Sequence, residues 1–170
     1  VIPFAQSAFD SKMTIHLEDE TSKLFLLEII SCGRNAHEER FQYRRFSSKV
    51  LLYRVEKLIY RDNTRYEPGK MPMEGIGLYE GFTHMANLFL SKLCDRGDAD
   101  GLDRTSELKE KIWQILDEDS EVDGGVTRLT TGDLALRIFG HRAQKLQQIA
   151  EKIKEIYTSC QINHKSVMNE

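Results

Sequence analysis

The segment from Leu26 to Tyr66 constrains the fold of this 170-residue chain more than any other segment. It begins as an apolar, β-branched run that carries a single carboxylate, Glu28, and it breaks at Cys32-Gly33-Arg34. Because the run from Lys23 to Ile30 is almost continuously apolar, the sequence predicts a strand that is buried on both faces. The glycine that follows is expected to provide a bend or a bulge.

Alternating and β-branched patterns continue on both sides of this run and predict a β-rich body over residues 10 to 65. The predicted strands cover residues 13–18, 23–30, 39–46, 48–55 and 58–62. Because they are short and sequential, a meander or a stack of hairpins is favoured over a parallel βαβ sheet. A loop rich in proline and glycine, residues 67–77, ends this half of the chain.

Helical spacing of apolar residues appears only after that loop. It predicts helices near 80–94, 105–118 and 142–157, and a strand pair near 126–139 that turns around Thr-Thr-Gly-Asp. Residues 158–170 form a polar tail that is expected to fray. The fold class is therefore mostly β with a few α-helices (α+β), in a single domain over residues 1–157.

Composition and motifs exclude several function classes. The net charge of −3, with no accompanying motif, argues against nucleic-acid binding. No apolar run reaches the length of a membrane helix, and three scattered cysteines suggest a reducing, cytoplasmic setting. The sequence has no P-loop, no GxSxG, no HExxH and no GxGxxG motif, so no catalytic residue is predicted and the chain is not expected to be an enzyme.

Glu28 is the most informative single residue, because a bare charge inside an apolar strand is prohibitively costly. Two interpretations remain open. In the structural one, which the physics favours, Glu28 forms a bidentate pair with Arg34 and stabilises the bulge. In the functional one, it lines a wet internal passage in which cations move between oxygen ligands. His37, beside Glu38 and Glu39, is the best local metal candidate, but a solvated turn is favoured and no firm metal site is predicted.

Several short motifs occur in an order that resembles the UreD (UreH) urease accessory proteins. They are Ile2-Pro3-Phe4, Ala8-Phe9, Glu28, Gly33-Arg34, Glu38-Glu39-Arg40-Phe41, Gly81-Phe82-Thr83-His84, Gly125-Val126-Thr127-Arg128-Leu129 and Leu136-Arg137-Ile138-Phe139-Gly140. Glu38 stands where the family has glycine. The resemblance spans about residues 1 to 157, and the chain is expected to be the C-terminal portion of a larger UreD-like domain.

The resemblance implies a stacked-strand, β-helix-like body and a non-catalytic role as a chaperone in urease maturation. It implies a scaffold, and a possible nickel conduit, between a GTPase-containing accessory complex and apo-urease. Partners would be UreF, UreG and the urease apoprotein, with transient Ni²⁺ and no tightly bound cofactor. Glu28 and Glu39 would line the nickel route, and Gly33 and Arg34 would shape the corner. The alternative is a β-rich protein–protein interaction module without a metal role.

Overall fold

The computed structural model describes residues 1–93 and 104–167, with side chains described up to residue 160. The chain divides into two compact units. Unit 1 comprises residues 1–22 and 30–85, and unit 2 comprises residues 23–29 and 86–170. The single domain predicted over residues 1–157 stays a prediction.

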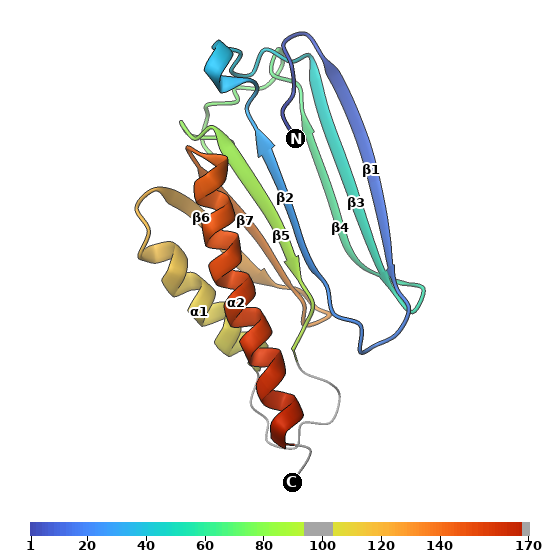
Figure 1. Ribbon diagram of the computed structural model, residues 1–170. Helices are drawn as coiled ribbons and strands as arrows, with labels where there is room; N and C mark the ends of the chain where they lie inside the picture. The colour runs from blue at the N-terminus through green and yellow to red at the C-terminus, as the bar shows by residue number, and fades with distance from the viewer. Residues whose placement is uncertain (94–103, 168–170) are drawn as a thin grey trace. The chain divides into compact units, whose positions relative to one another are not determined.

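Unit 1 is built on a three-stranded sheet with strand order β1-β3-β4 (Figure 1). Its strands are β1 (Ala8–Leu17), β3 (Arg45–Arg54) and β4 (Lys57–Tyr66). β3 and β4 form an antiparallel hairpin that turns at Val55-Glu56, where both residues have positive φ. β1 pairs with β3 in parallel. The predicted meander is therefore wrong at this point, because the chain makes β2 in between and only then returns to pair with β1.

Burial alternates strictly along β3, so the two faces of this sheet differ. Phe46, Val50 and Leu52 are buried, whereas the residues between them are partly exposed. Phe46 stacks on Phe9 of β1 and on Tyr66 of β4, with ring centroids 5.4 Å and 6.3 Å apart. This aromatic row fixes the register, because a slip by one residue would turn all three rings to the other face.

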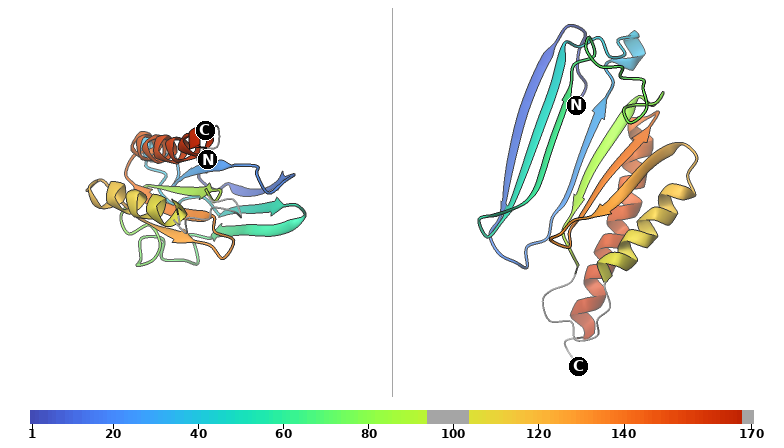
Figure 2. Two further views of the ribbon diagram at one scale, coloured as in Figure 1. Left: turned by 90° about the horizontal axis from the view of Figure 1, so that it is seen from below. Right: turned by 180° about the vertical axis from the view of Figure 1, so that it is seen from behind.

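Unit 2 is built around a four-stranded sheet of order β2-β5-β7-β6, with two helices (Figure 2). The strands are β2 (Phe25–Ser31), β5 (His84–Leu90), β6 (Val122–Arg128) and β7 (Leu134–Gly140), and the first residues of β5 and the last of β2 belong to unit 1. The helices are α1 (Arg104–Asp117) and α2 (Ala143–Val167). One apolar core joins alternate strand residues to both helices, including Leu88, Ile112, Ile138 and Leu146.

The structure confirms the predicted helices near 105–118 and 142–157 and the strand pair near 126–139. The third predicted helix is wrong, because residues 84–90 form β5 and Cys94 lies outside the described residues. The predicted strand over 39–46 is also wrong for its first six residues, since β3 begins at Arg45. The fraying predicted for the tail does not begin at Thr158, because α2 continues to Val167.

Two glycines of β6 explain how the hairpin and α1 pack. A Cβ on Gly124 would lie 2.5 Å from the carbonyl oxygen of Arg137, and one on Gly125 would lie 3.6 Å from the indole of Trp113. Trp113 therefore seats α1 against β6.

Candidate functional site: the Gly33–Phe41 corner and its pocket

The residues that most resemble a family motif gather at the turn after β2, within unit 1. β2 ends at Ser31, whose hydroxyl donates a hydrogen bond to the carbonyl oxygen of Gly33 at 2.8 Å. The chain then makes a short 3-10 helix, η1 (Asn35–His37), and Glu38 closes it in the left-handed conformation. The amide of Phe41 donates back to the carbonyl oxygen of Cys32 at 2.7 Å, so the loop is tied at its base.

Gly33 is required at this corner for two separate reasons. Its φ of +139° is a backbone conformation that residues with a Cβ rarely adopt. In addition, a Cβ at this position would lie 2.0 Å from the carbonyl oxygen of Glu39, far inside van der Waals contact. The close approach of the two backbone segments therefore depends on glycine, which agrees with its predicted structural role.

Arg34 engages Glu39 rather than Glu28, so the predicted partner was wrong. The Nε of Arg34 donates to Oε2 of Glu39 at 2.8 Å, and its Nη2 pairs with Oε1 in the same bidentate arrangement. Charge-assisted fork geometry of this kind is strong and orientation-specific. The sequence indicated that Arg34 forms an ion pair but not which carboxylate it binds, because only the 3-10 helix brings residue 39 back to residue 34.

The same pair holds the N-terminal segment. Oε2 of Glu39 also accepts a hydrogen bond from the amide of Ala5 at 3.1 Å, and the guanidinium carbon of Arg34 lies 4.8 Å from the centroid of the Phe4 ring. The hydrogen bonds from Arg34, followed by the one from Ala5, lower the pKa of Glu39 to about 2. Glu39 thus stays ionised at neutral pH, and both its oxygens already accept hydrogen bonds.

Arg40 forms a second link, from the corner to the loop after β4. It pairs with Glu74 at 2.7 Å and donates to the carbonyl oxygen of Phe82 at 3.1 Å. Next to it, Phe41 packs edge-on against the buried Tyr79, with centroids 4.9 Å apart. The corner is therefore fixed on two sides by a charged pair and in the middle by aromatic packing.

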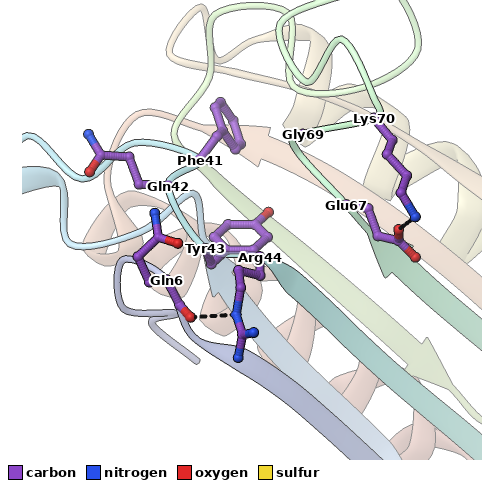
Figure 3. Close-up of a pocket in the computed structure, with 8 residues that line it drawn as sticks. All are labelled: Gln6, Phe41, Gln42, Tyr43, Arg44, Glu67, Gly69 and Lys70. Carbon is purple, nitrogen blue, oxygen red and sulfur yellow. Dashed lines mark hydrogen bonds and ion pairs between the residues drawn. The ribbon is translucent and has the colours of Figure 1, made fainter.

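A pocket of about 520 Å³ opens beside the corner, and no sequence motif indicated it (Figure 3). Its walls come from three separate stretches of unit 1, which is why no local pattern could reveal it. The lining residues are Gln6, Phe41, Gln42, Tyr43, Arg44, Glu67, Gly69 and Lys70.

The charged side chains that line the pocket are already engaged within the protein. Arg44 donates through Nε to the carbonyl oxygen of Gln6 at 2.8 Å, and Lys70 pairs with Glu67 at 2.6 Å. Hydrogen bonds from Lys70 and then from Arg65 lower the pKa of Glu67 to about 2. Burial raises the pKa of Tyr43, so its phenol stays protonated at neutral pH. The wall offers cations, amides and the aromatic residues Phe41 and Tyr43 to a ligand, and its one carboxylate, Glu67, is already paired with Lys70.

Glu28 lies elsewhere, on β2 within unit 2, and is half-buried. The backbone amide of Ser91 donates a hydrogen bond to the carbonyl oxygen of Leu24, and the backbone amide of Cys32 donates one to the carbonyl oxygen of Thr83. These two bonds make β2 and β5 antiparallel and set Glu28 level with Asn87. Asn87 in turn accepts a hydrogen bond from Nε of Arg137 at 2.9 Å.

Glu28 and Asn87 lie on the sheet face opposite the apolar core. Leu27, Ile29 and Leu88 pack into that core, and they are the immediate neighbours of Glu28 and Asn87 along their strands, where successive side chains point to opposite faces. The structure brings Gly33, Arg34 and Glu39 together in unit 1 and assigns Glu28 to unit 2. His37 of η1 and Glu38, which caps it, are exposed, as predicted for a solvated turn. Over the described residues, no group of three or more His, Cys, Asp or Glu side chains could hold a metal ion.

A family model described as "UreD urease accessory protein" matches residues 1–169. The chain belongs to the UreD family. Urease accessory protein UreH of Helicobacter pylori strain J99 is 30% identical over 158 residues, which are 93% of this chain and 55% of that protein. UreD of Acetivibrio thermocellus is 31% identical over 157 residues, 91% of this chain and 55% of that protein. UreH of Helicobacter acinonychis is 32% identical over 158 residues, 93% of this chain and 55% of that protein.

The chain thus spans about half the length of the curated relatives that it matches. Family membership gives the corner its context. Ile2-Pro3-Phe4, Gly33-Arg34 and Glu39, which are separate motifs in the sequence, are parts of one bonded unit in space. Neither helix in the described part of the chain has the length and apolar character needed to cross a membrane.

Proposed function

We propose that this chain is part of a factor that assists the maturation of urease and acts there as a non-catalytic scaffold. The observation that carries the proposal is the match to the UreD family over residues 1–169. The bonded corner supports it, because residues that mark the family hold one another in a defined geometry. A scaffold needs such fixed surfaces more than it needs reactive groups.

The partners in this proposal are UreF, UreG and the urease apoprotein, and its cargo is Ni²⁺. The predicted cytoplasmic location stays a prediction. Reconstitution by size-exclusion chromatography tests the scaffold. The protein should co-elute with UreF at micromolar concentration, and UreG and then the urease apoprotein should move the complex to larger size. Separate elution of each component would contradict the proposal.

Passage of nickel is the finer part of the proposal. Glu28 supports it, because this residue is half-buried at the level of the polar pair Asn87–Arg137, on the sheet face opposite the apolar core. Glu39 supports it less, since both its oxygens already accept hydrogen bonds. Carboxylate oxygen is an acceptable ligand for a borderline divalent cation, and a single oxygen at each step keeps binding weak enough for release.

The variant Glu28→Gln tests the nickel-route role separately from the scaffold role. Glutamine keeps the shape and one acceptor but removes the charge, so the variant should assemble normally and activate urease less. Normal assembly with normal activation would leave the scaffold intact and end the nickel-route hypothesis for Glu28.

A further inference from the structure

One face of the β1-β3-β4 sheet concentrates positive charge in a chain whose formal net charge is −3. Residues that are direct partners across the strands share a face. The face opposite Phe46 therefore carries five cationic side chains and one carboxylate, which we call the basic face: Lys12, Arg45, Lys49, Arg61, Arg65 and Asp10.

Side-chain contacts confirm this assignment of faces. Asp10 pairs with Arg45 across β1 and β3, and the rings of His16 and Tyr53 stack at 5.0 Å on the same side. Phe9 and Phe46 stack on the other side. The charge on the basic face is therefore a property of the sheet and not of a loop.

Three of the five cations have no ion pair with any described residue: Lys12, Lys49 and Arg61. Arg45 and Arg65 are paired with Asp10 and Glu67. Lys12 and Lys49 are moreover direct neighbours across β1 and β3, and like charges placed opposite each other destabilise a sheet.

Protection of a sheet edge does not explain this arrangement. Lysine on an edge strand such as β1 discourages unwanted strand pairing, but β3 is the central strand and has no free edge. Lys49 therefore adds electrostatic repulsion and protects no strand edge. A surface selected only for stability would have a carboxylate beside Lys49, in the way that Asp10 pairs with Arg45.

We propose that the basic face is a docking surface for an acidic surface of a partner protein. Leu51, Tyr53 and Leu58 lie on the same face as the charges, which suits a protein interface with mixed apolar and charged contacts. Nucleic acid fits less well. The His16 and Tyr53 rings are parallel within 8° and cover each other, so neither lies flat as a platform for a base.

The test uses the purified protein and fluorescent poly-L-glutamate as the acidic polypeptide probe. The triple variant K12Q/K49Q/R61Q removes the three unpaired charges. The control K109Q/K111Q/K152Q makes the same charge change on the helices of unit 2. We expect affinity to fall with added salt, to drop about tenfold in the triple variant and to change less than about twofold in the control.

Thermal melting checks the fold. The triple variant should melt at the same temperature as the wild type or higher, because it relieves the Lys12–Lys49 repulsion. Equal losses of affinity in both variants, or no binding of poly-L-glutamate, would overturn the proposal. Tighter binding to a DNA oligonucleotide, or to phosphatidylcholine vesicles with 30% phosphatidylserine, lost in the triple variant alone, would also overturn it and assign the face to that ligand.

Discussion

Replacement of Gly33 by alanine should destabilise unit 1 through two effects that the structure separates. The first is the positive φ of +139°, which costs a residue with a Cβ about 1–2 kcal/mol. The second is the contact of 2.0 Å between the new Cβ and the carbonyl oxygen of Glu39. That oxygen belongs to backbone that cannot rotate away, and forcing an extra methyl group into a packed site costs about 1–3 kcal/mol. The sum predicts a loss of about 2–5 kcal/mol.

Two matched substitutions separate the backbone strain from the close contact of the added Cβ. Gly77 has a φ of +78° but no neighbour within 4 Å of an added Cβ, so Gly77→Ala reports the backbone strain alone. Gly69 has neither feature, and Gly69→Ala should change the free energy of unfolding by less than about 0.5 kcal/mol. The expected order of stability is therefore Gly69→Ala, then Gly77→Ala, then Gly33→Ala.

Urea unfolding followed by circular dichroism measures these differences. With a slope of about 2 kcal/mol per molar urea, Gly33→Ala should lower the midpoint by about 1–2.5 M. Gly77→Ala should lower it by less than about 1 M. If Gly33→Ala were no worse than Gly77→Ala, the close approach of Gly33 to Glu39 would not exist in solution, and the bonded corner would have to be abandoned.

Three further predictions follow from the charged contacts. The pKa of Glu39 is lowered to about 2, so its contribution to stability is present above pH 4.5 and is lost as the pH falls toward 2. In Glu39→Gln the melting temperature should therefore depend less on pH between 4.5 and 2. Lys145 pairs with Asp119 at 2.7 Å, so Lys145→Glu should lower the melting temperature and the exposed Lys152→Glu should not; equal effects would contradict the ion pair. Glu28→Gln should reduce urease activation without loss of soluble protein, as activity and yield measured together will show.

The Lys145 contact also decides which residue can test whether the helices form a docking surface. Charge reversal at both Lys145 and Lys152 would be the simplest test of such a surface. Because Lys145 is largely covered and holds Asp119 and Glu121 at 2.7 and 2.9 Å, its reversal disturbs unit 2 itself. Lys152 alone is the suitable probe of the helix surface.

The elements with clear periodicity could be predicted from the sequence. The two helices that carry an apolar stripe beside a polar face form where expected. The helix predicted over 80–94 fails because six consecutive residues of β5, from Met85 to Leu90, are buried. A strand buried on both faces has no alternation, and the spacing of Met85, Ala86 and Phe89 then fits a helix equally well.

In the candidate site, too, some features could be predicted from the sequence and others could not. Gly33 and Arg34 could be found from the local break in the apolar run, because their role arises within a few residues. The pairing of Arg34 with Glu39 could not be found, because it depends on how η1 turns the chain back. The pocket could not be found either, because three separate stretches of the chain line it. The parallel pairing of β1 with β3 was hidden for a related reason: sequence order favours neighbouring strands, and β2 lies between them in the chain.

The nickel content of urease tests the central claim most directly. Urease would be purified from a host that lacks its own UreD, with and without this protein, and its bound nickel and its activity would be measured on the same samples. The account predicts that both rise together when the protein is present, and that Gly33→Ala reduces both. Urease that stays without nickel in the presence of soluble, folded protein would contradict the account.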